Sequence, residues 1–377
     1  MKILFNCLTM EKGGAERVIA LLSNYFSKDD SVSILTLTKS KDAYKLNSSV
    51  KRLHVDKTSY KSDNRIKKIF RKLSLARLFR LKKIIIAEKP DVIISFLPEP
   101  SLRLMFLRKF SFRLRKIPTI ISIRNDPERE YKNPLLKFVV KVLYKNVDGM
   151  VYQTNDAKKF FKDVIKTKNQ TVIQNPIDEK MLAKPKSDAK RKNIIVSVGR
   201  LEAQKNHEML IRAFGETLRS GEHDFMLKIY GEGSRRGFLQ NLIDELGLSG
   251  RVFLEGQVDD VIAKLNEAKI FVLSSHYEGM PNALMEAMAM GLACISTDCP
   301  CGGPRTLIEN GGNGVLVKNE DEKGLGREML RLMSDVELRA RLASNALEVR
   351  DKNGTMIVAG DWKKMIDKII SGKRDDK

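Results

Sequence analysis

The sequence predicts an α/β protein built from two doubly wound domains in tandem. Its 377 residues are too many for one ordinary core and suit two domains of somewhat less than ~200 residues each. Short apolar runs of strand length alternate with stretches of helix length along both halves, as in parallel sheets with crossover helices. A polar, lysine-rich stretch over 178–192 separates the halves and is typical of a linker.

The first half, 1–177, begins with a strand, a glycine turn and a helix. Lys2–Leu8 is a nearly continuous apolar run, Gly13 and Gly14 form the turn, and 15–26 carries apolar residues at helical spacing. Further strands are expected at 32–37, 91–96, 119–123 and 149–153. We therefore assign 1–177 to an N-terminal domain with a Rossmann-like sheet.

The second half, 193–358, repeats the alternation of strands and helices. Its strands are expected at 193–198, 225–230, 252–255, 270–273, 293–296 and 314–317. Apolar residues at helical spacing in 359–377 predict a last helix that packs on one of the domains, with a crossing back to the N-terminal domain as one alternative. Two doubly wound domains imply a cleft between them, and such sheets bind ligands at the carboxyl ends of their strands.

The positive charge of the chain is confined to its first half. Residues 1–190 hold 42 Lys and Arg against 19 Asp and Glu, whereas residues 191–377 hold 27 against 28. Two segments, Lys61–Lys83 and Arg103–Lys116, interleave basic with aliphatic and aromatic side chains, and we predict that both bind an anionic membrane surface. Solvated helix faces are the first alternative. Nucleic acid is the second, but no nucleic-acid-binding module is recognisable, so none is expected as a partner.

No segment predicts a membrane span or a secretion signal. The apolar stretches are of strand length, well short of the ~18 apolar residues of a transmembrane helix, and Glu11 and Lys12 interrupt the apolar start of the chain. We expect a cytoplasmic protein, peripherally associated with the inner face of the cell membrane. The four cysteines lack the paired spacing of a zinc site and are expected to be free structural thiols.

The most informative segment is Ser274–Gly291, where a strand end, a loop and a helix follow one another. Pro281 suits the first helical turn, and the helix N-terminus offers backbone amide groups to an anion such as a diphosphate. The residues at this end are Gly279, Met280, Pro281, Asn282 and Ala283. Glu278, in the loop, suits sugar hydroxyls. Glu286, inside an apolar helix, needs hydrogen-bond donors, which ribose hydroxyls would supply.

Glu278 and Glu286, eight positions apart, resemble the E-x7-E motif of family-4 retaining glycosyltransferases. The resemblance continues through Ile295–Arg305, covers most of 190–350 closely and reaches the first half through Gly13–Arg17. It implies the GT-B fold, in which an N-terminal acceptor-binding domain and a C-terminal nucleotide-sugar-binding domain, both Rossmann-like, face a central cleft. It also implies an enzyme of bacterial polysaccharide biosynthesis that moves a hexose or N-acetylhexosamine, with retention, from a UDP-sugar to a glycan or polyprenyl-linked acceptor.

The resemblance assigns roles to further residues. Arg200 and Lys205 resemble the cations that clasp the donor diphosphate, where they would stabilise the UDP leaving group; with Glu278 they are the expected catalytic residues. The other expected donor-binding residues are Gly13, Gly14, Gly231, Gly233, Gln257, Val258 and Glu286, together with those at the helix end. No Asp-x-Asp cluster stands in a suitable context, so we predict no metal and no other cofactor.

Two pairs of residues in the first half are expected to lie near the sugar or the acceptor. Gly13 and Gly14 allow the backbone to approach the transferring sugar closely, although a turn alone would also explain them. After the strand at 119–123, Arg124 and Asn125 stand where many relatives carry a histidine near the sugar. Because of this departure, either Arg124 or Asn125 is expected to make the contact instead.

Retention commonly proceeds through a carboxylate nucleophile, but no residue of the sequence is clearly placed for that role. The resemblance instead implies front-face departure, in which the leaving diphosphate oxygen accepts the acceptor's proton. Two other classes remain as alternatives. An NAD-dependent oxidoreductase needs a glycine fingerprint that Gly13–Arg17 does not supply. A non-catalytic nucleic-acid or membrane-binding protein would use the basic half alone.

Overall fold

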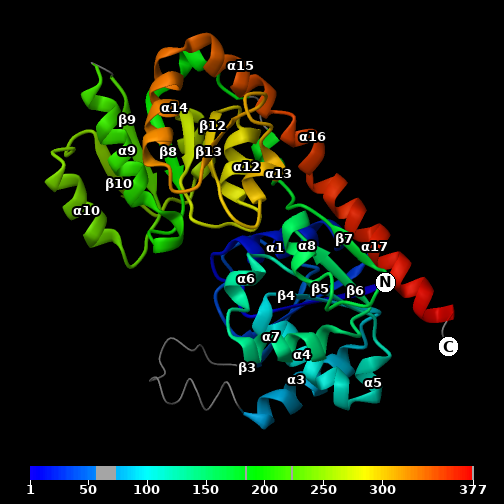
Figure 1. Ribbon diagram of the computed structural model, residues 1–377. Coiled ribbons are helices and arrows are strands. Elements are labelled where there is room, and N and C mark those ends of the chain that lie inside the picture. Colours follow the sequence, from blue (N-terminus) through cyan, green and yellow to red (C-terminus); the bar gives the residue numbers. More distant parts are fainter. Residues whose placement is uncertain (57–73, 183–184, 222–223, 376–377) are drawn as a thin grey trace. The chain divides into compact units, whose positions relative to one another are not determined.

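The computed structural model describes residues 1–56, 74–182, 185–221 and 224–375 (Figure 1). Most of the predicted membrane segment Lys61–Lys83 therefore lies outside the described residues, and only 74–83 can be placed. By its internal contacts the chain divides into two compact units. Unit 1 comprises Met1–Pro176 and Thr355–Lys377, and unit 2 comprises Ile177–Gly354.

Unit 1 has a seven-stranded parallel sheet with the order β3-β2-β1-β4-β5-β6-β7. Its strands are β1 (Lys2–Cys7), β2 (Ser31–Thr38), β3 (Lys51–Asp56), β4 (Val92–Phe96), β5 (Thr119–Ser122), β6 (Gly149–Tyr152) and β7 (Gln170–Val172). In the middle of the sheet, Phe5 of β1 pairs with Ile34 of β2 on one side and with Ile94 of β4 on the other. The chain leaves β1 in both directions, which is the doubly wound topology that the sequence predicts.

The sequence does not predict β3 and β7, the two edge strands of this sheet. Within β3 only Val55 and Asp56 are buried, and all three residues of β7 are half-buried. An edge strand is covered less completely than a central one, so it needs no continuous apolar run. Polar edge strands of this kind cannot be recognised from apolar patterning alone.

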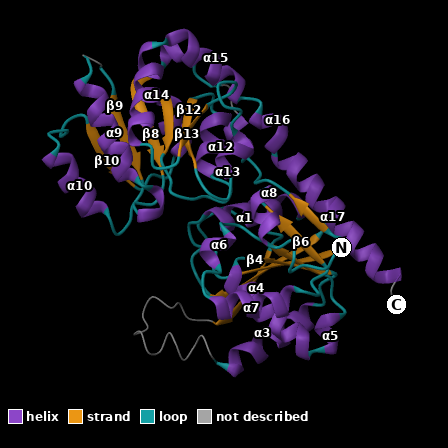
Figure 2. Ribbon diagram, viewed as in Figure 1, coloured by secondary structure: helices purple, strands orange, loops and turns teal. Residues whose placement is uncertain are grey.

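Helices cover both faces of the unit 1 sheet (Figure 2). They are α1 (Gly14–Phe26), α3 (Leu75–Glu88), α4 (Pro98–Phe110), α5 (Phe112–Arg115), α6 (Pro127–Glu130), α7 (Pro134–Tyr144), α8 (Asn155–Phe160) and α17 (Thr355–Asp375). Val18 and Leu22 of α1 share a buried cluster with Trp362 of α17. Leu81 of α3 and Leu104 of α4 belong to a second cluster, together with Leu114 of α5. Thus α1 and α17 pack on one face, and α3, α4 and α5 on the other.

The last helix, α17, contributes to the core of unit 1. Trp362 is fully buried, and its ring stacks on the ring of Phe96 at a centroid distance of 5.9 Å. Ile366 and Ile369 are buried in the same cluster. Unit 1 is therefore assembled from two segments of the chain that are separated by the whole of unit 2.

Unit 2 has a six-stranded parallel sheet with the order β10-β9-β8-β11-β12-β13. Its strands are β8 (Lys192–Val198), β9 (Met226–Tyr230), β10 (Val252–Gly256), β11 (Ala268–Leu273), β12 (Ala293–Asp298) and β13 (Val315–Lys318). Its helices are α9 (His207–Arg219), α10 (Arg236–Glu245), α11 (Val261–Glu267), α12 (Asn282–Ala289), α13 (Gly303–Leu307), α14 (Glu322–Ser334), α15 (Val336–Ala346) and α16 (Val349–Asn353), with 3₁₀ helices η2 (Glu179–Leu182), η3 (Asp188–Lys190) and η4 (Ala203–Lys205). All six strands that the sequence predicts for this half are present, and the predicted fold class is confirmed.

The described part of 178–192, the predicted linker, packs within unit 2. The Asp188 carboxylate accepts hydrogen bonds from the buried guanidinium of Arg339 at 3.0 and 2.9 Å. The guanidinium of Arg191, also buried, donates to the main-chain carbonyls of Leu265, Ala268 and Met290. Charge-assisted bonds of this kind hold the segment against the sheet and helices of the unit.

None of the helices in the described part of the chain is long and apolar enough to cross a bilayer. All four cysteines are free and buried. Burial raises the pKa of the Cys299 thiol to about 12, so this thiol stays protonated and behaves as a small apolar side chain.

Candidate active site

The predicted donor-binding residues of unit 2 lie at the carboxyl edge of its sheet. One of them follows each of four neighbouring strands: Arg200 after β8, Gly231 after β9, Gln257 after β10 and Glu278 after β11. Because neighbouring parallel strands end at the same edge, their loops meet there. The Gly231 amide donates to the Gly256 carbonyl at 2.8 Å and so joins the loops after β9 and β10. Val258 is half-buried in the same loop as Gln257, which is exposed.

Helix α12 begins where the sequence predicts it. Its first residue is Asn282, Pro281 is at the N-cap position, and Gly291 ends the helix in the left-handed conformation with φ of +64°. Glu278, in the loop before the helix, and Glu286, inside it, are each 6% exposed. The sequence places Glu278 in the loop and Glu286 inside the helix, as the structure has them, and anticipates the burial of Glu286. It does not predict the burial of Glu278, and the ribose contact of Glu286 stays a prediction.

Glu278 and Lys205 form an ion pair. Lys205 Nζ lies 2.5 Å from Glu278 Oε1, and the Ser275 hydroxyl donates to the same oxygen at 2.7 Å. The Ser274 hydroxyl donates to the carbonyls of Lys205 and Asn206, at 3.0 Å each, which ties the loop after β8 to the loop after β11. A buried carboxylate fixed in this way offers its remaining lone pairs to hydrogen-bond donors such as sugar hydroxyls.

Arg200 is exposed at the same edge. Within the described chain its guanidinium has one hydrogen-bond partner, the side-chain oxygen of Gln204 at 3.2 Å. The Gln204 amide group in turn donates to the Tyr277 carbonyl at 3.0 Å, so this glutamine links Arg200 to the loop of Glu278. Most of the five N–H donors of Arg200 face solvent, where an anionic ligand can accept from them.

Gly231 and Gly233 have a packing role that the sequence does not reveal. A Cβ atom at Gly231, which has φ of +149°, would lie 1.9 Å from the Gly199 carbonyl oxygen, and one at Gly233 would lie 2.4 Å from the Leu201 carbonyl oxygen. The Leu201 amide donates to the Glu232 carbonyl at 3.0 Å. This turn therefore supports the backbone on both sides of Arg200, while its contact with the donor stays a prediction.

Gly303 supports the loop that carries Glu278, and the sequence gives no role for it. It begins α13, and a Cβ atom there would lie 1.7 Å from the Gly279 carbonyl oxygen and 2.9 Å from Pro281 Cδ. The loop that carries Glu278 thus rests directly on the backbone of α13. Only glycine fits this approach without a shift of the main chain.

The predicted residues of unit 1 lie at the carboxyl edge of its own sheet. Gly13 and Gly14 follow β1 and begin α1. The Tyr44 hydroxyl donates to the Gly13 carbonyl at 2.9 Å and accepts from the Gly13 amide at 3.3 Å. Gly13 has φ of −166°, an extended conformation open to any residue. Its backbone conformation therefore does not by itself require glycine, and the predicted close approach to the sugar stays a prediction.

Arg124 is held by unit 1 itself. The residue is 8% exposed, and its guanidinium donates to the Ser122 hydroxyl at 3.3 Å and to the Asn175 side-chain oxygen and stacks over the Phe96 ring at 5.1 Å. Burial lowers the pKa of Arg124 to about 9. Asn125, the other predicted residue, is half-buried. Of the two, Asn125 is the more accessible to a ligand.

Glu130, which the sequence does not single out, follows β5 at the end of α6. Its carboxyl is partly exposed, and burial together with the nearby Asp126 carboxylate raises its pKa from 4.5 to about 7. Between these two pH values the folded chain keeps a proton that the unfolded chain has lost, so this group destabilises the fold as the pH rises through the interval.

We therefore expect Glu130→Gln to stabilise unit 1 in a pH-dependent way. The variant should melt like the wild type near about pH 4, where the carboxyl is neutral in both states, and at a higher temperature above about pH 7. Thermal unfolding followed by circular dichroism across this range measures the difference. A melting-temperature difference that does not change with pH would contradict the assignment.

Within the described residues, no group of three His, Cys, Asp or Glu side chains is placed to hold a metal ion. The carboxyl edge of unit 2 instead offers two cations, Arg200 and Lys205, to an anion. Their proximity to Glu278 makes the edge suited to a ligand that combines phosphate with sugar hydroxyls.

Two protein families match the chain. Residues 12–180 match Glycosyltransferase Family 4, and residues 178–349 match Glycosyl transferases group 1. The second match contains the ion pair of Lys205 with Glu278 and the whole carboxyl edge described above.

Curated relatives cover nearly the full chain. One is the GalNAc-alpha-(1->4)-GalNAc-alpha-(1->3)-diNAcBac-PP-undecaprenol alpha-1,4-N-acetyl-D-galactosaminyltransferase of Campylobacter jejuni, 27% identical over 366 residues, which are 97% of this chain and 98% of the relative. Another, from the same species, is the N-acetylgalactosamine-N,N'-diacetylbacillosaminyl-diphospho-undecaprenol 4-alpha-N-acetylgalactosaminyltransferase. It is 28% identical over 351 residues, 90% of this chain and 92% of the relative.

Solved structures share the fold. Sucrose-phosphate synthase from Thermosynechococcus elongatus superposes with a TM-score of 0.84 at 17% identity, covering 98% of this chain and 99% of that one. HepE from Anabaena, solved in complex with UDP, superposes with a TM-score of 0.79 at 16% identity, covering 98% and 100%.

Proposed function

This chain belongs to the family-4 glycosyltransferases with the GT-B fold, and we propose that it moves a hexose or N-acetylhexosamine, with retention and without a metal ion, from a UDP-sugar to a glycan or polyprenyl-linked acceptor. The observation that carries the proposal is the ion pair of Lys205 with Glu278, beside Arg200 and the N-terminus of α12. The names of the two Campylobacter relatives, with undecaprenol-diphosphate-linked acceptors, and the UDP complex of HepE support the choice of acceptor and donor.

Donor binding exchanges partners within the ion pair. The donor diphosphate competes with Glu278 for Lys205 and accepts further hydrogen bonds from Arg200 and from the amides at the start of α12. Release of Lys205 leaves lone pairs of the Glu278 carboxylate for the hydroxyls of the sugar. The cations are then already in place when negative charge develops on the leaving UDP.

Front-face departure fits the roles of these residues. Glu278 is fixed as a hydrogen-bond acceptor and Glu286 lies inside α12, so we assign neither as a nucleophile. The bond from the anomeric carbon to the acceptor oxygen forms on the face where the bond to the diphosphate oxygen breaks. That leaving oxygen takes the acceptor's proton, and the chain contributes positioning and charge stabilisation.

A UDP-release assay over a panel of UDP-sugars, with and without polyprenyl-diphosphate-linked glycans, tests this function. We expect turnover with one or a few donors, undiminished by EDTA, and an α-linked product from an α-linked donor. Loss of activity with EDTA would contradict metal independence, and a β-linked product would contradict retention. If NAD or an oligonucleotide, rather than UDP, raised the melting temperature, one of the alternative classes would replace the proposal.

The proposal includes peripheral binding of unit 1 to the anionic inner face of the cell membrane. Helices α3, α4, α5 and α7 of unit 1 expose large apolar side chains, which we name the aromatic face: Leu75, Phe79, Phe106, Phe110, Phe112, Leu135, Phe138 and Val142. Helix α4 contacts α3, α5 and α7, so these side chains lie on adjoining helices (Figure 1). Exposed apolar groups bordered by cations are typical of a surface that enters a headgroup layer.

Not every cation of the two predicted membrane segments is available to lipid. Arg77 is buried, with its Nε 3.0 Å from the Asp56 carboxylate, and the buried Arg108 donates to Asp148 at 2.6 Å. These two arginines stabilise unit 1. The exposed cations of the second segment are Lys109, Arg113, Arg115 and Lys116. Attraction to an anionic leaflet therefore depends on fewer charges than the sequence suggests.

The double variant Phe110→Ser/Phe112→Ser is expected to lower partitioning into anionic vesicles by roughly tenfold or more, because two large apolar groups no longer enter the lipid. Their side chains are 69% and 65% exposed, so the fold should not depend on them. Vesicle sedimentation measures the effect, with Phe238→Ser, an exposed phenylalanine of unit 2, as the control. Equal sedimentation of the two variants would contradict membrane binding by this face.

A further inference from the structure

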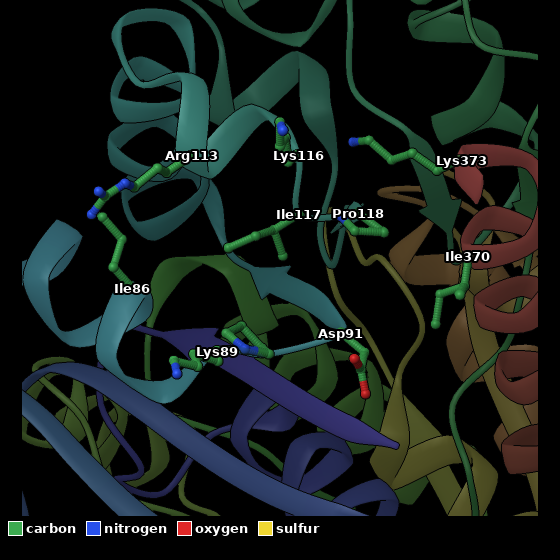
Figure 3. A pocket seen from close by; sticks show the side chains of 10 residues that line it. Ile86, Lys89, Asp91, Arg113, Lys116, Ile117, Pro118, Ile370 and Lys373 are labelled. Atoms are coloured by element: carbon green, nitrogen blue, oxygen red, sulfur yellow. The ribbon is translucent and has the colours of Figure 1, made fainter. Parts of the chain in front are cut away.

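Unit 1 contains a cavity of about 370 Å³ at the amino ends of β4 and β5 (Figure 3). This volume is within the range of small-molecule sites, roughly 300–1,000 Å³. Lys89 and Asp91 on its wall come just before β4, and Ile117 comes just before β5. The cavity therefore lies at the opposite edge of the sheet from Gly13 and Arg124, away from the site residues that the sequence predicts for unit 1.

The wall of this cavity combines apolar and cationic side chains. Ile86, Ile117 and Ile370 supply apolar surface. Four cations line it, and Figure 3 shows them spread around the cavity: Arg113 of α5, Lys373 of α17, and Lys89 and Lys116, which are the C-cap residues of α3 and α5. Against four cations there is one acid, Asp91.

The charges of the cavity are only partly neutralised by the protein. The Asp91 carboxylate already accepts a hydrogen bond from the Lys2 amide at 2.7 Å, and Lys373 pairs with Asp148 at 2.7 Å. In the part of the chain that the structure describes, neither Lys89 nor Arg113 forms an ion pair. Cations on the wall of a cavity that have no carboxylate partner favour an anionic ligand.

Lys89 has a backbone conformation that is unfavourable for residues with a side chain. It caps the C-terminus of α3 in the left-handed conformation with φ of +52°, and glycine adopts this conformation at a lower free energy than any residue with a side chain. The ammonium interacts favourably with the helix C-terminus. It also reaches the cavity, so a ligand there would account for a lysine at a glycine position.

We propose that this cavity binds a phosphate group, attracted by the cations of its wall, Lys89, Arg113 and Lys116, with the attached carbon chain against Ile86 and Ile117. The phosphate belongs either to an anionic phospholipid headgroup or to a free phosphate ester. The aromatic face favours the lipid, because Phe112, next to Arg113 in α5, is 65% exposed and has the Lys116 ammonium 4.6 Å from its ring. In that case the cavity deepens the membrane part of the proposed function.

The test is a titration of the full chain with two soluble probes, glycerol 3-phosphate and short-chain dihexanoyl phosphatidic acid, with dihexanoyl phosphatidylcholine as a zwitterionic reference. We expect Lys89→Gly/Arg113→Gln to weaken binding of the phosphate probes by roughly tenfold or more, since two charge-assisted contacts are lost. Glycine suits the backbone at position 89, so the variant should fold. The matched control Lys323→Gln/Lys368→Gln removes two exposed charges elsewhere and should bind like the wild type.

The outcomes separate the two sources and the two proposals. Tighter binding of phosphatidic acid than of glycerol 3-phosphate identifies a lipid headgroup, and equal binding identifies a free phosphate ester. No saturable binding of either phosphate probe, or equal weakening in the control variant, overturns the site. UDP affinity and UDP release should be unchanged in all variants, so failure of the phosphate site leaves the transferase proposal standing. Failure of the transferase assay likewise leaves these titrations interpretable.

Discussion

Glu278→Gln is expected to bind UDP at least as tightly as the wild type and to lose most of its transferase activity. The amide no longer holds the Lys205 ammonium as an ion-pair partner, so Lys205 is more available to the diphosphate. The same change replaces a carboxylate, which can accept hydrogen bonds from sugar hydroxyls on both oxygens, with a group that has only one acceptor oxygen. Loss of one such preorganised contact typically lowers kcat by about 10²–10³.

This result requires two measurements on the same preparation. UDP affinity, measured by calorimetry, reports whether the cations bind the diphosphate. UDP release with the preferred donor reports whether the contact between residue 278 and the sugar is retained. Glu309→Gln, which changes an exposed carboxylate in the same unit, is the matched control and should retain full activity. Wild-type turnover by a folded Glu278→Gln variant would remove Glu278 from the site, and a large loss of UDP affinity would contradict the exchange of partners.

Gly303→Ala is expected to reduce both stability and activity, although residue 303 touches neither predicted cation. Its Cβ would lie 1.7 Å from the Gly279 carbonyl oxygen, so the backbone of α13 or the loop that carries Glu278 must shift. Overpacking of this kind typically destabilises a protein by about 1–3 kcal/mol. A displaced Glu278 also loses its alignment with the sugar, and catalysis is sensitive to shifts of about 1 Å.

Thermal unfolding and UDP release together measure the Gly303→Ala effect. Gly360→Ala is the control, because a Cβ there meets nothing within 4 Å and the residue lies inside α17. Alanine should stabilise that helix by up to about 1 kcal/mol. If both variants had the same melting temperature and activity, the close approach of α13 to the Glu278 loop would contribute to neither stability nor catalysis.

Of the thirteen strands in the described chain, alternating apolar runs and helical stretches predict eleven: the nine central strands, which are buried on both faces, and the edge strands β10 and β13, which keep enough apolar residues to be recognised. The same reasoning fails at β3 and β7, whose edge positions allow polar residues. At the site, Pro281 and Gly291 predict α12, with Glu278 in the loop before it and Glu286 buried inside it, but nothing in the sequence predicts that Glu278 is buried.

What the sequence does not reveal is contact between loops that are distant along the chain. Nothing in the spacing of Lys205 and Glu278 indicates that these two side chains pair, because the contact depends on β8 and β11 being neighbours in the sheet. The packing of Gly303 on Gly279 and of Gly231 on Gly199 is hidden for the same reason. Arg124 could be placed after β5, but its burial against Phe96 and Asn175 depends on tertiary packing.

Because unit 1 is assembled from two segments of the chain, its core cannot be completed on the ribosome until α17 has been synthesised. Trp362, which covers Phe96, is synthesised only after every residue of unit 2. While unit 2 is being synthesised, the face of the unit 1 sheet that α17 later covers is therefore only partly covered, by α1. Unit 1 thus cannot complete its core first, although domains usually fold in the order in which they emerge. Unit 2, by contrast, is contiguous, and it can close its core before translation ends.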